Sequence, residues 1–152
     1  MIRLATLTDI AVLTKLYQAL ATEMHQLQPQ NYQANYAPDF FEWEKMITDT
    51  NQAVYLETLQ NGTIIGFSHV TTARTSPSAL FVPHFFAYLT ALYVQPDYRR
   101  QGLARQLLAQ VEQWRQSQKL AYLELNVLAN NQAATKLYQN AGFTAQNYTF
   151  RH

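Results

Sequence analysis

One run of ten almost unbroken apolar and aromatic residues, FFAYLTALYV at 85–94, restricts the fold of this 152-residue chain more than any other segment. A strand with one face in solvent alternates apolar and polar residues, whereas a strand covered on both faces reads as a continuous apolar run. The run therefore predicts a central strand with helices against both faces of its sheet. A helix is predicted soon after it, because an apolar stripe recurs at helical spacing through Leu103, Leu107, Leu108, Val111 and Trp114.

Further strands and helices are indicated on both sides of this unit. We expect a strand over 2–5, a helix capped by Thr8, and a short helix near 40–47. Two β-rich runs within 53–73 are joined by Asn61-Gly62, a pair that favours the type I′ turn of a hairpin. The remaining expected elements are a strand over 120–128, a helix over 132–140 and a last strand over 142–150.

This order of elements predicts the fold class. No repeat, low-complexity tract or linker divides the chain, so residues 1–152 are expected to form a single domain. The domain is of the α/β (α+β) class, with a mixed, mostly antiparallel twisted sheet and helices on both faces.

Composition excludes several classes of function. The formal net charge is +1, whereas nucleic acids and acidic membranes are held by many Lys and Arg on one face, so no nucleic acid and no membrane is expected as a partner. The chain has no cysteine, which excludes a disulfide framework and a thiolate nucleophile, and its four histidines lack HxxxH or HxH spacing, so no metal site is expected. Without an apolar signal region, or a run near the ~18 apolar residues of a membrane span, the chain is predicted to be cytoplasmic.

The turn between the central strand and its helix, QPDYRRQG at 95–102, combines basic residues with one of only four glycines. The first backbone N–H groups of a helix lack internal partners, and the helix dipole adds positive potential there, so a phosphate fits such a place. Gly102 would let a phosphate approach the backbone, and Arg99, Arg100 and Arg105 would add charge. In the alternative interpretation, Gly102 only shapes the turn and the arginines are solvated. Neither a G-x-x-x-x-G-K-[ST] nor a G-x-G-x-x-G motif is present, which argues against ATP in a P-loop and NAD in a Rossmann turn.

Two segments carry a resemblance to a known family. Residues 99–104, RRQGLA, resemble the [R/Q]-x-x-G-x-[G/A] signature of the GCN5-related N-acetyltransferase (GNAT) superfamily. Residues 131–143, NQAATKLYQNAGF, are similar to that family's N-x-x-A-x-x-L-Y-x-x-x-G-F segment, and the opening residues 2–17 are similar to its usual start. The two motifs occur in the expected order and together span about 90–143.

The resemblance implies acetyl-CoA as donor and a set of donor-binding residues. The backbone of Arg99, Arg100, Gln101, Gly102, Leu103 and Ala104 would hold the pyrophosphate, with Arg105 adding charge. Leu92, Tyr93 and Val94 would pair through their main chain with the pantetheine arm, which requires the central strand to splay from the strand at 120–128. Asn131 would either hydrogen-bond the donor or cap the helix that follows it.

Tyr138 and Glu124 are the candidate catalytic residues. Tyr138 matches the family position that protonates the leaving CoA thiolate, although it could instead be a core aromatic residue. Family members often carry a carboxylate in the strand before LYV, where this chain has Thr90 and Ala91, so a direct carboxylate base on that strand is in doubt. Glu124 on the neighbouring strand is the first candidate for the base, and His69 and His84 are the others; for each of them a purely structural role remains an alternative.

The leading hypothesis is an N-acetyltransferase that moves acetyl from acetyl-CoA to a primary amine by direct attack through a tetrahedral intermediate. The acceptor would be a small molecule or a peptide amine, and no metal is required. Acidic residues near the second helix, at 39, 42, 44 and 49, would suit a cationic amine or simply form a solvated face. The alternatives are a non-catalytic acyl-CoA-binding regulatory module and a binding domain without any cofactor. Aromatic clusters within 32–43 and 81–88 would wall the acceptor pocket, lie in the core, or form a homodimer interface.

Overall fold

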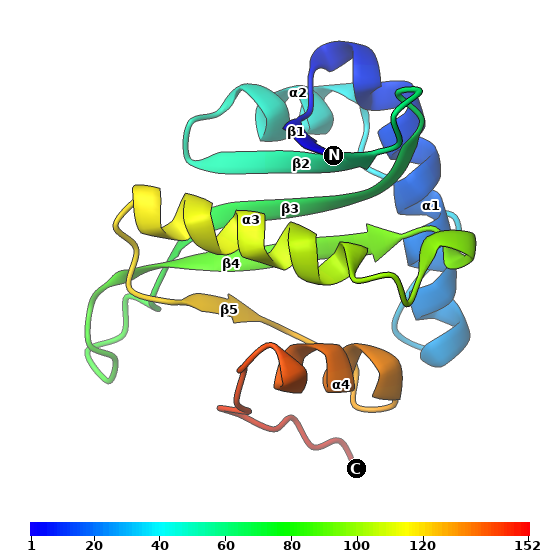
Figure 1. Ribbon diagram of the computed structural model, residues 1–152. Coiled ribbons are helices and arrows are strands. Elements are labelled where there is room, and N and C mark those ends of the chain that lie inside the picture. Colours follow the sequence, from blue (N-terminus) through cyan, green and yellow to red (C-terminus); the bar gives the residue numbers. More distant parts are fainter.

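A single open sheet with helices on both faces organises the computed structural model, which describes residues 1–152 (Figure 1). The strands are β1 (Ile2–Leu4), β2 (Gln52–Thr58), β3 (Ile64–Arg74), β4 (Phe85–Val94) and β5 (Leu123–Leu125), in that spatial order. The helices are α1 (Ile10–Leu27), α2 (Phe40–Thr48), α3 (Leu103–Ser117) and α4 (Gln132–Asn140), with short 3₁₀ turns at Leu7–Asp9 and Pro96–Tyr98. Strands β1 to β4 are antiparallel neighbours, and β5 is parallel to β4. The predicted fold class, a mixed and mostly antiparallel sheet, is confirmed.

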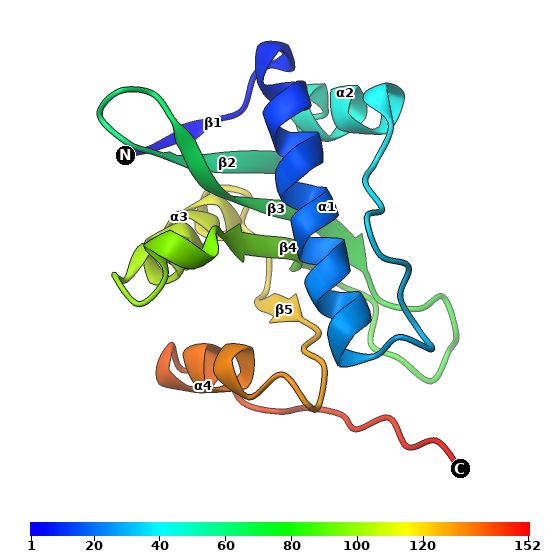
Figure 2. The same ribbon diagram turned by 90° about the vertical axis from the view of Figure 1, so that its right-hand side faces the viewer.

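Two apolar cores lie on opposite faces of the sheet. Helices α1 and α2 cover one face, where Leu13, Trp43 and Phe67 are fully buried. Helix α3 covers the other, where Leu107 and Val111 are fully buried. Figure 2 shows α1 and α3 on opposite sides of β3 and β4. Strand β4 contributes buried residues to both cores, as its continuous apolar sequence predicts.

A β-bulge in β4 changes which face its side chains occupy. Val70 pairs with Leu89 and His69 pairs with Ala91, so Thr90 has no partner on β3. Before the bulge, Ala87 and Leu89 face α3; after it, Ala91 and Tyr93 face α1. An unpaired residue in a strand reverses the alternation of side chains beyond it. The bulge therefore lets one strand supply both cores.

Strands β4 and β5 separate after a short contact. Only Ala87–Leu89 of β4 pair with Leu123–Leu125 of β5, and β4 then continues to Val94 without a partner on that side (Figure 1). On its other side, β4 approaches β3 closely at this end, because a Cβ on Gly66 would lie 2.7 Å from the carbonyl oxygen of Tyr93. The splay that the family resemblance requires is present, and it exposes one main-chain edge of β4 over its last residues.

Two predicted local features are wrong. The cap of the first helical segment, which begins at Leu7 and leads into α1, is formed by Thr6 and Asp9 rather than Thr8. The backbone N–H and the hydroxyl of Thr6 both donate to the Asp9 carboxylate, which Arg3 also binds at 2.8 Å. The β2–β3 hairpin forms, but its turn is not type I′, because only Gly62 has a positive φ (87°). Asn61 instead accepts a hydrogen bond from the backbone N–H of Thr63 at 3.0 Å.

The predicted last strand over 142–150 is also absent. Residues 144–152 are exposed, and no ladder joins them to β5. In Figure 1 this segment runs along α4 and away from β5. A strand requires a hydrogen-bonding neighbour. The β-like sequence at 142–150 finds no such neighbour, and local propensity alone does not form the strand.

Candidate active site

The turn after β4 presents an uninterrupted series of free backbone donors. None of the N–H groups from residue 100 through residue 105 donates a hydrogen bond to a backbone acceptor, and the helical ladder begins with Gln106 N–H to the carbonyl of Gly102 at 3.0 Å. Arg100 and Gly102 both adopt left-handed backbone conformations, with φ of 61° and 80°. A Cβ on Gly102 would have no atom within 4 Å, so the space that a side chain would occupy at this residue is open. Successive free N–H groups that end at a helix N-terminus form a site for an anion such as a phosphate.

The three arginines in this turn and in the first turn of α3 have different environments. Arg99 is bound within the protein: its Nε donates to the carbonyl of Val94 at 2.8 Å, its Nη2 binds Glu23 at 2.6 Å, and its guanidinium lies over the Tyr93 ring. Arg100 and Arg105 are exposed and form no ion pair. The predicted charge at the turn therefore comes from Arg100 and Arg105, whereas Arg99 ties the end of β4 to α1.

A groove runs beside the splayed strands. It has a volume of about 1010 Å³ and lies between α3, β5, α4 and the segment that follows α4. Arg105, Glu124, Asn126 and Tyr138 contribute to its lining. The fold thus brings Tyr138 and Glu124, which lie on α4 and β5, into one groove with Arg105 of the first turn of α3.

Tyr138 is a partly buried phenol that stays protonated. It lies on α4, packs against the core under α3, and contacts Phe143 edge-on with ring centroids 5.8 Å apart. Burial raises the pKa of Tyr138 to about 12, so its hydroxyl remains protonated across the neutral range. The ring of Tyr138 packs against the core, as the alternative interpretation predicted, and the residue also lines the groove.

Glu124 lies opposite Tyr88 in the parallel register of β4 and β5. Leu123 and Leu125 pack toward α3, so the alternation of a strand directs Glu124 toward the α1 face. Burial, and next the negative charge of Glu124, raise the pKa of Tyr88. Glu124 forms no ion pair, which leaves its carboxylate free for another cation.

The other predicted candidates have structural partners. His84 precedes β4 at the end remote from the basic turn, where it contacts the Tyr122 hydroxyl at 2.6 Å. Asn131 caps α4 by accepting from the backbone N–H of Ala134 at 3.1 Å, as its alternative interpretation predicted. Among the acidic residues, Asp39 and Glu42 form the capping box of α2. No group of three or more metal-binding side chains occurs, and no helix is long and apolar enough to cross a membrane.

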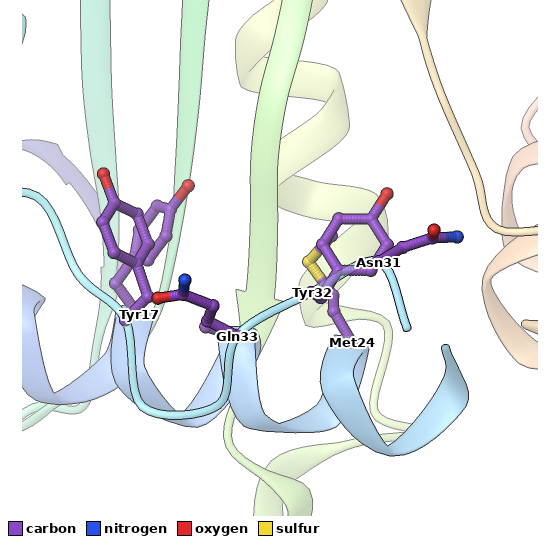
Figure 3. Close-up of a pocket in the computed structure, with 7 residues that line it drawn as sticks. Tyr17, Met24, Asn31, Tyr32 and Gln33 are labelled. Carbon is purple, nitrogen blue, oxygen red and sulfur yellow. The ribbon is translucent and has the colours of Figure 1, made fainter. Parts of the chain in front are cut away.

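A second cavity lies between α1 and the segment at 31–36, where two residues of the aromatic cluster predicted within 32–43, Tyr32 and Tyr36, line it. It has a volume of about 460 Å³ and is lined by Tyr17, Ala21, Met24, Asn31, Tyr32, Gln33 and Tyr36 (Figure 3). Figure 3 shows the hydroxyls of Tyr17 and Tyr32 pointing away from α1. Tyr17 lies against the Phe67 ring of β3, with ring centroids 6.0 Å apart, so the cavity adjoins the α1 face of the sheet. Tyr17 reads in the sequence as an ordinary apolar position of a helix, so only the fold reveals its place in a tyrosine cluster.

Comparisons with known proteins identify relatives of this chain. Residues 13–143 match the model of the acetyltransferase (GNAT) family. The chain is 30% identical over 118 residues to the [ribosomal protein bS18]-alanine N-acetyltransferase of Escherichia coli, covering 76% of this chain and 73% of that protein. It is 30% identical over 96 residues to an aminoglycoside N(6')-acetyltransferase type 1 of Acinetobacter baumannii, covering 63% and 58%.

Solved structures share the fold at low sequence identity. A mutant of the BH1408 protein from Bacillus halodurans superposes with a TM-score of 0.92 at 17% identity, covering 100% of this chain and 98% of that one. An aminoglycoside N-acetyltransferase, AAC(6')-Iy, solved in complex with CoA, superposes with a TM-score of 0.76 at 19% identity, covering 100% and 97%. Together with the two motifs, the free backbone donors and the splayed strands, these matches show that the chain belongs to the acetyltransferase (GNAT) family, whose members are acetyl-CoA-dependent N-acetyltransferases.

Proposed function

We propose that this protein transfers the acetyl group of acetyl-CoA to a primary amine by direct attack of the amine nitrogen on the thioester. The observation that carries the proposal is the series of free backbone N–H groups at 100–105, placed directly after the strand that separates from its neighbour. A pyrophosphate suits the first feature and an extended amide-containing arm suits the second. CoA has both parts in one molecule.

The residues around the turn fit the donor. The backbone N–H groups from residue 100 to 104 would bind the pyrophosphate, with Arg100 and Arg105 adding charge and Gly102 leaving room, whereas the N–H of Arg99 already donates to the carbonyl of Pro96. The free edge of β4 at Leu92–Val94 would pair with the pantetheine arm. The side-chain amide of Asn131 would contact the donor while its oxygen continues to cap α4.

The transfer requires three proton movements. An alkyl ammonium with a pKa near ~10.4 has no lone pair for attack, so Glu124 would accept one proton from it. The new N–C bond then forms, and a main-chain N–H at the end of β4 would stabilise the oxyanion. The C–S bond breaks as Tyr138 gives its proton to the departing thiolate, and the nitrogen then passes its second proton to the tyrosinate oxygen, which leaves a neutral amide and restores the phenol.

The tyrosine-lined cavity is the proposed acceptor site. Its wall carries three tyrosines and no ionised side chain. Tyrosine rings attract a cationic amine through their π faces, and their hydroxyls accept its hydrogen bonds. A volume of about 460 Å³ accommodates a small molecule or one residue of a peptide. We therefore propose a small-molecule or peptide amine as acceptor.

A second candidate function is a regulatory module that binds acyl-CoA without transferring the acyl group. The absence of a carboxylate at position 90 of β4 favours it. Tyr138 and Glu124 both line the groove, and their presence favours the enzyme, because neither side chain is needed to hold CoA.

Binding of acetyl-CoA is the first prediction. At about 100 times its Kd, a ligand adds ~2.7 kcal/mol to the free energy of unfolding, which raises the melting temperature by roughly 5 to 10 °C for a chain of this size. Thermal unfolding should show this rise with acetyl-CoA and with CoA, but not with NAD. Arg105→Gln should reduce it, whereas Lys15→Gln, which removes one exposed charge on α1, should not. An equal rise in both variants would remove Arg105 from the donor site.

Turnover is the second prediction, and it separates the two candidate functions. Purified protein should release CoA from acetyl-CoA faster when a suitable primary amine is added, measured as free thiol over a panel of polyamines, aminoglycosides and peptides. The product should carry one added acetyl group by mass spectrometry. Binding of acetyl-CoA without acceptor-stimulated CoA release across the panel would favour the regulatory module.

Tyr138→Phe should lower kcat by about 10- to 100-fold while leaving the Kd of acetyl-CoA within about twofold, because the ring remains and only the proton donor is lost. Kinetics with the best amine of the panel, and calorimetric titration of acetyl-CoA, measure the two quantities. Tyr148→Phe is the matched control, since that hydroxyl lies in the exposed segment after α4. An unchanged kcat in Tyr138→Phe would exclude this hydroxyl from the reaction.

Glu124→Gln should lower kcat/KM about 100-fold at pH 7, because the amide cannot accept the ammonium proton. The deficit should shrink as the pH rises toward ~10, where solvent has already deprotonated the amine. Rates of both proteins from pH 6 to pH 10 measure this, with Glu44→Gln on α2 as control. A deficit that stays constant over the whole pH range would contradict the assignment of Glu124 as the base.

A further inference from the structure

Four side chains form a hydrogen-bonded chain that ends at the bulge of β4. The Gln52 Nε2 lies 3.3 Å from a carboxylate oxygen of Asp49, and the Gln52 Oε1 lies 2.8 Å from the His69 Nε2. The other ring nitrogen of His69, Nδ1, contacts the Thr90 hydroxyl. The chain therefore runs from the end of α2, across β2 and β3, to β4.

The chemistry of these groups fixes the direction of every bond. Hydrogen bonds from the backbone N–H of Asn51 and from Gln52 lower the pKa of Asp49, so its ionised carboxylate can only accept. Gln52 must then turn its NH₂ to Asp49 and its oxygen to His69. The His69 Nε2 carries the ring proton as a result, and Nδ1 is left as an acceptor for the Thr90 hydroxyl.

Burial keeps His69 in this state. The residue is 5% exposed, and desolvation lowers its pKa to about 4, so the ring is neutral at physiological pH. A neutral ring with its proton on Nε2 accepts at Nδ1 throughout the neutral range. The carbonyl oxygen of His69 lies 3.2 Å from the same Thr90 hydroxyl. Both acceptors available to Thr90 lie on the protein side, so its single hydroxyl proton points inward and its lone pairs point outward.

Thr90 stands at the place where the reaction is proposed to occur. It is exposed, although its neighbours Leu89 and Ala91 are each only 5% exposed. It is the first residue of β4 beyond the contact with β5, and it precedes the free edge at Leu92–Val94. Its bond to the His69 ring places its hydroxyl on the α1 face of the sheet, the face toward which Glu124 also points.

We propose that the Thr90 hydroxyl oxygen accepts a hydrogen bond from the attacking amine and thereby aims the nitrogen lone pair at the thioester carbon. Thr90 touches the substrate in this role, and His69, Gln52 and Asp49 act as positioning residues behind it. No proton is transferred to Thr90 or His69; Glu124 remains the proposed base. This inference rests on the proposed amine acetyltransferase function. It assigns a function to the position at which a carboxylate was expected from the family resemblance.

Kinetics of three threonine variants test the proposal with the best amine of the panel. Thr90→Val keeps the shape of the side chain but removes the acceptor oxygen, and should lower kcat about tenfold or more, with the Kd of acetyl-CoA within about twofold. Thr90→Ser should recover most of the lost kcat. Thr72→Val makes the same chemical change on β3, where Thr72 pairs with Ala87 and faces α3, and should leave kcat unchanged. A Thr90→Val protein that turns over like wild type would overturn the proposal.

The tautomer of His69 gives a test that does not depend on turnover. Long-range ¹H–¹⁵N spectra of the wild-type protein at pH 7 should show a neutral His69 ring with its proton on Nε2, and the Nδ1 resonance should shift in Thr90→Val. A charged ring, or a proton on Nδ1, would overturn the proposal even if the enzyme is active. Wild-type protein that shows the expected tautomer but no acceptor-stimulated CoA release would instead refute the proposed function, and with it the role of Thr90 toward an amine.

Discussion

The separation of β4 from β5 after three paired residues is the constraint on which the rest of the site depends. A strand in the middle of a sheet normally uses both of its edges, and burial of unpaired backbone groups carries a cost. In this chain β4 keeps its partner β3 to its last residue but loses β5 after Leu89. The free edge of β4 beyond Leu89 follows from this one departure from regular pairing. Over the residues that have no partner on β5, β4 is held by its pairing with β3 and by the apolar cores on its two faces.

Backbone geometry, more than side-chain charge, makes the candidate anion site. Two residues with left-handed backbone conformations, Arg100 and Gly102, lie just before α3, and the N–H groups of residues 100–105 donate to no backbone acceptor. Of the three arginines nearby, Arg99 is bound to Glu23 and to the carbonyl of Val94, so its charge is already compensated. A near-neutral protein can bind a doubly charged group in this way, because the site is built from local dipoles and needs no basic surface.

The sequence predicted those parts of the structure that depend on local patterns. The continuous apolar run of β4 is a signal within one segment, and the cores on both faces confirm it. Gly102 lies in an open turn, and its place in a donor site remains a prediction. The predicted strand over 142–150 was wrong because a strand depends on a neighbour that the sequence does not specify. The hydrogen-bonded chain was beyond prediction for a similar reason, since His69 lies 17 residues from Gln52 and 21 from Thr90. The roles of Tyr138 and Glu124 remain predictions; the structure shows only that they line one groove.

The residue type at position 90 follows from the hydrogen-bonded chain behind it. An ionised carboxylate at this position could only accept a hydrogen bond, and the unprotonated Nδ1 of His69 can also only accept one, so the two groups would repel. The repulsion would be relieved only if the ring proton moved from Nε2 to Nδ1 or if the ring became charged. A tautomer change would leave Nε2 facing the oxygen of Gln52, and a charged ring would oppose the burial that lowers the pKa of His69. A hydroxyl donates inward and accepts outward at the same time. Threonine is therefore compatible with a buried neutral histidine where aspartate or glutamate is not. Under the proposed function, the proton-accepting carboxylate would come instead from the neighbouring strand, where Glu124 lies.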